Sequence, residues 1–246
     1  MPHTDTDSAL AERLLHMAHS LPPRRLTRIE HDGRAYYVKT PERHASLRWR
    51  VQKGDPESAF AREISLLIEF RQRGAAVPRI VAQDAGYLVL ADHGIPLQSM
   101  IYQQTADHAL MRQTGKALAE LHALGLAHGR PSLRDICWDG AELTFLDLEA
   151  GARVQASPRD QARDLFLLLH SVFLTGGSDT ALAAPVLDAY RSHGDAAVWH
   201  ATQARARGLW WLELLTRPGA WLHHWRGKTR CEFAAIRAAR ALIARG

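Results

Sequence analysis

Residues 128–149 read HGRPSLRDICWDGAELTFLDLE, and this stretch carries the clearest pattern in the chain. It predicts a polar loop, a short strand, an Asp139-Gly140 turn and a second apolar strand. Asp135 then lies just before the first strand and Asp147 at the end of the second. Two carboxylates on opposite sides of a tight hairpin could together hold one hard cation, because such cations prefer oxygen ligands.

Length and composition are those of an ordinary globular chain with a sizeable core. Of 246 residues, 46% are hydrophobic and 23% are charged. Lys plus Arg exceed Asp plus Glu by 31 − 26 = 5, which suits an anionic ligand or an anionic membrane surface. The 2 cysteines have no metal or redox spacing and read as reduced thiols. Residues 1–8 do not resemble a secretory signal, and no apolar run could span a bilayer, so we expect a cytoplasmic protein that could contact the inner membrane only peripherally.

The first part of the chain is dominated by strand patterns. We expect a helix over 9–20 and a hairpin whose strands, 26–30 and 34–39, flank an Asp-Gly turn. Asp55 and Pro56 predict the start of a helix that ends before Gly74. Two further strands are expected near 79–83 and 87–90, and the basic residues of 41–55 are expected to form an exposed connection.

Helical patterns follow residue 90. Residues 91–96 read as a linker, and helices are expected over 106–124 and 158–173. The remainder is expected to be helical apart from a turn at 217–219. The pattern predicts an α+β fold of two lobes. Residues 1–92 would form a small antiparallel-sheet lobe with one long helix, and 93–246 a larger helical lobe that carries the hairpin.

Glu63 interrupts an apolar stripe of the helix expected after Pro56. Phe60, Leu67 and Phe70 share its face. A carboxylate on that face needs either a partner or a shifted pKa, unless it reaches solvent at the edge of the stripe. The sequence by itself leaves both accounts of Glu63 open.

The order of these features resembles the protein-kinase-like fold over about residues 25–175. The strand lysine Lys39, the helix acid Glu63, the His128 loop and Asp147 at a strand end follow one another as they do in that fold. The likeness is greater to the bacterial branch that includes lipopolysaccharide core kinases, such as 3-deoxy-manno-octulosonic acid kinases, and aminoglycoside-type phosphotransferases. In that branch the third motif also ends in an acidic residue, as residues 147–149 do.

The resemblance implies ATP and Mg²⁺ as cofactors and gives each matching residue a role. Lys39 would contact the nucleotide phosphates and Glu63 would pair with it. Residues 91–94, with Leu90 and Asp92, would form the hinge that reads the adenine edge. His128 would brace the catalytic loop, and Asp164, on the helix that supports this loop, would fix its backbone. Asp135 and Asp147 would bind the metal ion.

Two departures from the family pattern bear on activity. No G-x-G-x-x-G loop precedes Lys39, although the backbone N–H groups of such a loop normally bind phosphates. Arg130 occupies the position of the catalytic aspartate, and a guanidinium cannot accept a proton. Arg130 could instead neutralise the transferring phosphoryl group or hold an anionic acceptor, with Asp135, Glu149 or a water orienting the acceptor hydroxyl.

The function expected from the resemblance is phosphorylation of a small molecule, such as a sugar or lipid-linked sugar of the lipopolysaccharide core. The alternative is an inactive pseudokinase, in which Arg130 replaces the metal and the chain binds a nucleotide or a protein. The chain has no room for the activation segment of a protein kinase. Its basic residues are dispersed, which disfavours nucleic acid as a partner. Tryptophans and basic residues over 210–230 predict either helix packing or contact with anionic lipid.

Overall fold

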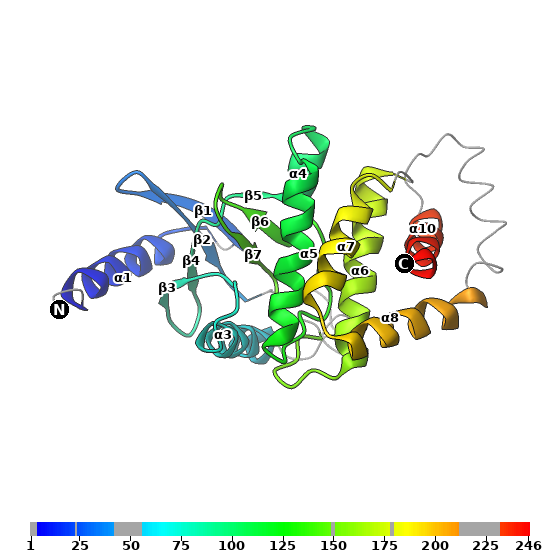
Figure 1. The fold of residues 1–246 in the computed structure, drawn as a ribbon. Coiled ribbons are helices and arrows are strands. Elements are labelled where there is room, and N and C mark those ends of the chain that lie inside the picture. Colours follow the sequence, from blue (N-terminus) through cyan, green and yellow to red (C-terminus); the bar gives the residue numbers. More distant parts are fainter. Residues whose placement is uncertain (1–3, 23, 42–55, 149–150, 178–179, 212–231) are drawn as a thin grey trace. The chain divides into compact units, whose positions relative to one another are not determined.

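The computed structural model describes residues 4–22, 24–41, 56–148, 151–177, 180–211 and 232–246. The chain divides into two compact units (Figure 1). The first comprises Met1–Arg73 and Val77–His93, and the second comprises Gly74–Ala76 and Gly94–Gly246.

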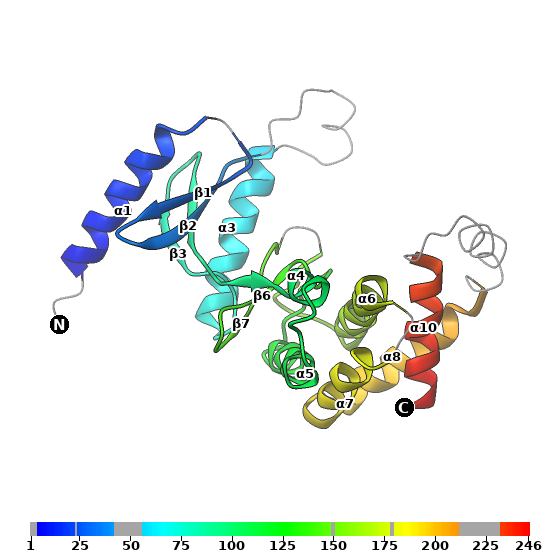
Figure 2. The same cartoon turned by 90° about the horizontal axis from the view of Figure 1, so that it is seen from above.

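The first unit is a four-stranded antiparallel sheet with a helix on either side (Figure 2). Its elements are α1 (Thr4–His19), β1 (Leu26–His31), β2 (Arg34–Lys39), α3 (Pro56–Gln72), β3 (Ile80–Gln83) and β4 (Leu88–Ala91). The strand order is β1-β2-β4-β3, so β2 is an interior strand. Its alternation places Tyr36 and Val38 in an apolar core with Leu14 and Ala18 of α1. Lys39 therefore points to the opposite face of the sheet.

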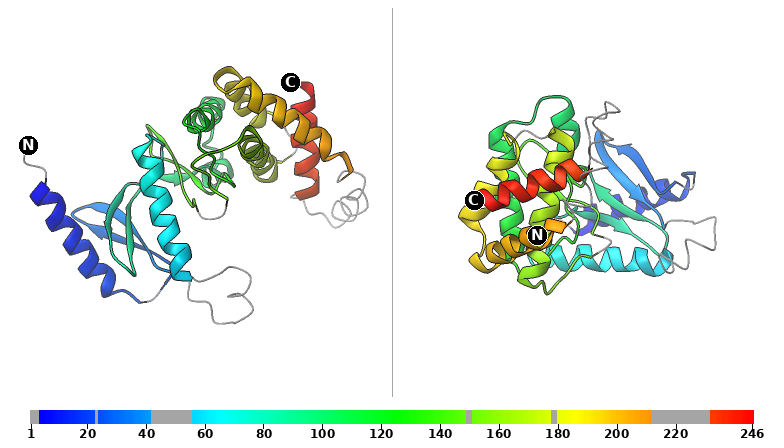
Figure 3. Two further views of the ribbon diagram at one scale, coloured as in Figure 1. Left: turned by 90° about the horizontal axis from the view of Figure 1, so that it is seen from below. Right: turned by 90° about the vertical axis from the view of Figure 1, so that its right-hand side faces the viewer.

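The second unit combines a small sheet with a group of helices. Strands β5 (Ile95–Pro96), β6 (Ile136–Trp138) and β7 (Leu143–Phe145) pair in that order. The helices are α4 (Leu97–Tyr102), α5 (His108–Ala123), α6 (Pro158–Gly176), α7 (Ala183–His193), α8 (Ala196–Gly208) and α10 (Glu232–Arg245). Helix α10 packs on α6 and α8 (Figure 3). Gly115 lets α5 approach α7 closely, because a Cβ there would lie 2.1 Å from the Val186 carbonyl oxygen.

Most of the expected elements are present, with some corrected bounds. The Asp-Gly turn joins β1 to β2, and the 136–146 hairpin pairs Ile136 with Phe145. The expected linker at 91–96 was wrong in part, because Ile95 and Pro96 pair with Trp138 and Cys137 of β6 and α4 follows at once. The first helix begins at Thr4 rather than residue 9, since no helix breaker lies between them. The expected cap at Asp55, the connection over 42–55 and the 217–219 turn lie outside the described residues.

Candidate active site

Lys39 and Glu63 form an ion pair inside the first unit. The Lys39 Nζ donates to the Glu63 Oε1, and their side chains are 14% and 5% exposed. Lys39 is fixed because β2 is paired on both sides, and Glu63 lies on the buried face of α3 with Phe60 and Leu67. The account of Glu63 as a solvent-reaching edge residue was wrong, and the expected partner is confirmed.

The end of β4 carries the expected adenine-reading segment. Leu90 is buried and pairs with Tyr37 of β2. Asp92 is exposed, and its backbone N–H donates to the Ala35 carbonyl at 3.3 Å. This pairing continues the sheet one residue beyond β4, so the backbone of the segment is held by the strand that carries Lys39. Its contact with a nucleotide remains a prediction.

His128 braces the loop of the second unit. Its Nε2 lies 2.7 Å from the Leu146 carbonyl, and the Arg130 backbone N–H donates to its Nδ1 at 3.4 Å. Because a backbone N–H can only donate, Nδ1 accepts and Nε2 carries the proton that binds Leu146. Burial lowers the pKa of His128, so the neutral ring that this arrangement requires is favoured. His128 is therefore a positioning group here and not a charged one.

Asp164 fixes the backbone at the next residue of the loop. The Gly129 N–H donates to both of its carboxylate oxygens, at 2.9 and 3.1 Å, and the aspartate is fully buried. Gly129 has a φ of +93°, and a Cβ there would lie 2.3 Å from the Gly151 carbonyl carbon. Only glycine fits this close approach. The contact expected of Asp164 with the loop is thus present.

Two residues that the sequence did not single out complete the support of Asp164. His122 of α5 lies with its Nε2 3.5 Å from an Asp164 carboxylate oxygen, and its Nδ1 is 2.6 Å from the Tyr190 hydroxyl of α7. Burial raises the pKa of Tyr190, which keeps its hydroxyl protonated and able to donate to Nδ1. In that tautomer the His122 Nε2 carries the proton and faces Asp164, at a distance longer than a normal hydrogen bond. The one sequence signal for this network was a histidine among the leucines of the α5 apolar stripe.

Asp135 and Asp147 lie on neighbouring positions of the hairpin. The Leu146 N–H donates to the Asp135 carbonyl at 2.7 Å, so Asp147 follows the backbone partner of Asp135. The Asp135 side chain accepts from the Ser132 hydroxyl at 2.6 Å and from the Arg134 Nε at 3.2 Å. Asp147 has a φ of +63°, a strained value for a residue with a side chain and one that often marks a functional position.

The two aspartates fit a Mg²⁺ site that is completed by a substrate. Within the described ranges, no group of three His, Cys, Asp or Glu side chains could hold a metal ion by itself. Mg²⁺ does not require such a group, because it commonly binds through one or two carboxylates together with substrate phosphates and waters. The hydrogen bonds from Ser132 and Arg134 would orient the Asp135 carboxylate for that role.

Arg130 is exposed at the position where the kinase-like pattern has its aspartate. The guanidinium that contacts Asp135 belongs instead to Arg134. Among the described residues, Arg130 has no ion pair with either hairpin carboxylate. Its side chain is therefore available to solvent or to an anionic group. Glu149, the other acid that could orient an acceptor, lies outside the described residues.

These features are those of the protein-kinase-like fold: an antiparallel-sheet unit with a Lys–Glu pair and a helical unit with a braced loop. Residues 89–190 match the model of the lipopolysaccharide kinase (Kdo/WaaP) family. The matched stretch contains His128, Asp135, Asp147 and Asp164. It confirms the family resemblance that the motifs indicate.

Individual proteins are similar to this chain at low identity. An uncharacterized protein of Haemophilus influenzae is 25% identical over 198 residues, which cover 79% of this chain and 81% of that protein. A probable bifunctional tRNA threonylcarbamoyladenosine biosynthesis protein of Natronomonas pharaonis is 32% identical over 149 residues, 59% of this chain but only 27% of that protein. The EKC/KEOPS complex subunit BUD32 of Gibberella zeae is 26% identical over 180 residues, 63% of this chain and 67% of that protein. The comparisons support a kinase-like phosphotransferase, a class that uses ATP.

Proposed function

We propose that this chain is an ATP- and Mg²⁺-dependent phosphotransferase that phosphorylates a sugar hydroxyl of the lipopolysaccharide core. The observation that carries the proposal is the buried ion pair between Lys39 and Glu63. A lysine held by a buried acid is the arrangement that kinase-like enzymes use to bind nucleotide phosphates. The family match over residues 89–190 supports the sugar as acceptor. Such a protein would act in the cytoplasm, in peripheral contact with the inner membrane.

Each site residue has a defined task in this proposal. Lys39 would bind the α- and β-phosphates while Glu63 keeps its ammonium in place. Asp147, assisted by Asp135, would hold Mg²⁺, which neutralises charge on the phosphates when bound. His128 would hold the loop that presents Arg130. Because Arg130 stays protonated, it would donate hydrogen bonds to the transferring phosphoryl group rather than accept a proton.

Loss of the usual aspartate is compatible with transfer. In most analyses the phosphoryl group passes through a loose transition state, so positioning and charge neutralisation supply most of the rate. A general base typically contributes 10²–10⁴-fold, on the order of what a well-placed arginine can supply. A slower but active enzyme is therefore expected.

A catalytically inactive nucleotide-binding protein is the second candidate. Arg130 in place of the aspartate favours it, and so does Arg134, whose guanidinium lies on the Asp135 carboxylate. A built-in cation beside Asp135 could substitute for a metal ion. This candidate predicts nucleotide binding without a Mg²⁺ requirement and no phosphoryl transfer.

Thermal unfolding with ATP, with and without Mg²⁺, tests nucleotide binding. A ligand that binds only the native state raises the unfolding temperature. Lys39→Met should abolish the rise when each variant is compared with its own ligand-free form. Lys116→Met is the matched control, because Lys116 is an exposed lysine paired with Glu120 on α5. An undiminished rise in Lys39→Met would place the nucleotide elsewhere.

Replacement of Asp147 tests the metal site. Asp147→Asn should remove the part of the ATP effect that depends on Mg²⁺, since an amide oxygen is a weaker ligand than a carboxylate. Asp188→Asn, an exposed aspartate on α7, is the control. If Mg²⁺ still raises the unfolding temperature of Asp147→Asn with ATP, the metal is held by other residues.

Arg130 separates the two candidate functions. In an active enzyme, Arg130→Ala should lower turnover by on the order of 10³, the scale for arginines that stabilise phosphoryl transfer. Arg159→Ala, an exposed arginine at the start of α6, should leave turnover unchanged. A wild-type protein with no transfer to any core sugar and no Mg²⁺ requirement would identify the inactive candidate. Undiminished transfer by Arg130→Ala would contradict both accounts of this residue.

A further inference from the structure

Two tryptophans lie exposed just beyond the end of α8 in the second unit. Trp210 is 62% exposed and Trp211 is 46% exposed. A single exposed aromatic side chain is common on proteins, but adjacent exposed indoles keep a large apolar area in water. Tryptophan is the residue most enriched where a membrane meets water, because its ring is apolar and its N–H is polar.

The helices beside these tryptophans are strongly basic. Residues 196–211 and 232–245 contain five arginines and one acid, Glu232, for a net charge of 5 − 1 = +4. The arginines are Arg205, Arg207, Arg237, Arg240 and Arg245. We call this pair of helices, together with Trp210 and Trp211, the α8–α10 face. Arg207 and Arg240 line its pocket, whereas the Arg205 guanidinium lies over the Phe166 ring of α6. Its charge is complementary to an anionic surface.

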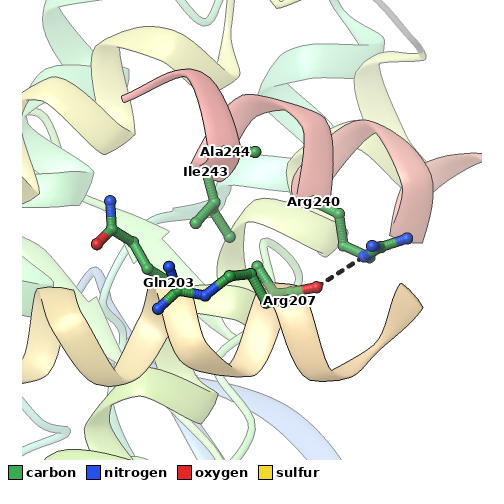
Figure 4. Close-up of a pocket in the computed structure, with 6 residues that line it drawn as sticks. Gln203, Arg207, Arg240, Ile243 and Ala244 are labelled. Atoms are coloured by element: carbon green, nitrogen blue, oxygen red, sulfur yellow. Dashed lines mark hydrogen bonds between the residues drawn. The ribbon is translucent and has the colours of Figure 1, made fainter. Parts of the chain in front are cut away.

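A small pocket lies between the two helices (Figure 4). Arg207 and Gln203 of α8 and Arg240 of α10 supply its polar wall, and Ile243 and Ala244 its apolar one. The Arg240 Nε also donates to the Ala206 carbonyl at 2.8 Å, which ties the end of α8 to α10. Two guanidinium groups beside an aliphatic wall suit a phosphate ester that carries a hydrocarbon part.

We propose that the α8–α10 face docks on the surface of a membrane that contains anionic lipids. The indoles of Trp210 and Trp211 would enter the headgroup region, and the arginines would bind lipid phosphates. In the part of the chain that the structure describes, no helix is long and apolar enough to cross a bilayer. The association is therefore one with the surface. The proposal assigns a surface to the peripheral membrane contact of the proposed function, and it can be tested apart from phosphoryl transfer, because binding to lipid needs no nucleotide and no acceptor.

A lipid surface fits this face better than a nucleic acid does. Proteins that bind single strands place aromatic rings along a basic groove, so that successive bases can stack on them. Here the described aromatic pair lies at one helix end, and the pocket between the arginines is walled by Ile243 and Ala244, which offer a base no ring. Combined apolar insertion and charge is the pattern of interfacial helices.

Sedimentation with lipid vesicles tests the proposal. The full chain should bind vesicles of phosphatidylcholine with a third of phosphatidylglycerol, and bind phosphatidylcholine alone much more weakly. Molar salt should reverse the binding to anionic vesicles, because the Debye length falls to about 3 Å. Failure to bind anionic vesicles at low salt would overturn the proposal, whatever the outcome of the ATP experiments.

Matched variants assign the binding to this face. Arg207→Gln with Arg245→Gln should weaken binding about 25-fold, since each basic residue near an anionic surface contributes about fivefold. Arg13→Gln with Arg62→Gln, two exposed arginines of the first unit, should have no effect. Trp210→Ala with Trp211→Ala should weaken binding by on the order of tenfold, and Tyr102→Ala, whose side chain is also exposed at 47%, should not.

Three results would refute the assignment. Equal losses in the test and control arginine pairs would show that net charge and not this face binds lipid. Binding of an RNA duplex or single strand that requires Arg207 and Arg245, without vesicle binding, would identify a nucleic-acid surface. A dimer in light scattering that dissociates in Trp210→Ala with Trp211→Ala would mean that a second copy covers the indoles. Unfolding curves of each variant would confirm that all compared proteins are folded.

Discussion

Two buried carboxylates, one in each unit, are stabilised in different ways. Glu63 is 4% exposed and receives a full positive charge from Lys39, on a different element of the same unit. Asp164 is fully buried and has instead a backbone N–H of Gly129 and the ring of His122. Glu63 forms an ion pair with another side chain, whereas Asp164 holds the backbone of a loop. Removing one partner should therefore lower the stability of the protein in different ways at the two carboxylates.

Asp164→Ala should cause the greatest loss of stability. It leaves the Gly129 N–H buried without an acceptor and His122 without its carboxylate. Losing a buried charged partner typically costs about 3–5 kcal/mol of unfolding free energy. Chemical denaturation measures the loss, and Asp188→Ala on the exposed side of α7 should cost little. Equal effects of the two variants would show that the network does not stabilise the loop.

Lys39→Met should cost about 3 kcal/mol, because it removes the ammonium that pairs with Glu63 in an apolar stripe. The double variant Lys39→Met with Glu63→Leu should regain most of this loss, since apolar residues of similar size can replace a buried ion pair. Denaturation curves compare the single and double variants. No such rescue is available at Asp164, because one of its partners is the backbone N–H of Gly129. If the double variant is no more stable than Lys39→Met alone, the two buried carboxylates do not differ in this way.

The pKa of His128 makes stability depend on pH. Burial lowers this pKa in the folded state, so below about 6.5, the ordinary value for histidine, the unfolded chain binds a proton that the folded chain does not. Stability should therefore fall as pH decreases through that value, by at most about 1.4 kcal/mol per pH unit for one group. Denaturation at several pH values gives the slope, and His128→Gln should reduce it. Burial also lowers the pKa of His170, which therefore contributes to the pH dependence of stability in the same direction. His170→Gln measures that contribution separately from the one of His128.

Tyr190→Phe should have the smallest effect, about 1 kcal/mol, because it removes one hydrogen bond and keeps the ring packed. The change frees the His122 Nδ1 and allows the ring to take the tautomer that no longer presents an N–H to Asp164. The Gly129 amide resonance, which reports the hydrogen bond to Asp164, should shift in a nitrogen–proton correlation spectrum. Tyr102→Phe, which is exposed, should leave that resonance in place. If the Gly129 resonance does not shift in Tyr190→Phe, the Tyr190 hydroxyl does not act on the Asp164 hydrogen bond, and the residue contributes only by packing.

The sequence predicted the elements whose signals are local. The Asp-Gly turn after His31, the proline at the start of α3 and the glycine after it locate a hairpin and a helix because each is a property of adjacent residues. The same holds for the hairpin that carries Asp135 and Asp147. The order of motifs along the chain was enough to indicate the family resemblance, which the match over residues 89–190 supports.

What the sequence could not give depends on long-range contacts. Strand β5 has only two residues, and it exists because Ile95 pairs with Trp138, which lies far along the chain. Glu63 was recognised as an acid in an apolar stripe, and the family resemblance, not the local pattern, indicated Lys39 as its partner. The contact of His122 with Tyr190 joins residues 68 positions apart, and no local pattern reports it.

The strand order of the first unit has a consequence for synthesis of the chain. Strand β4 lies between β2 and β3, and α1 covers the sheet through contacts such as His19 with Asp84, 65 residues later. As the chain leaves the ribosome, the β1–β2 hairpin and α1 emerge first, yet their apolar faces stay open until residues 88–91 follow. Contacts of such separation form slowly and expose apolar surface in the interval. The apolar faces of α1 and of the β1–β2 hairpin are thus buried completely only when β4 takes its place in the sheet.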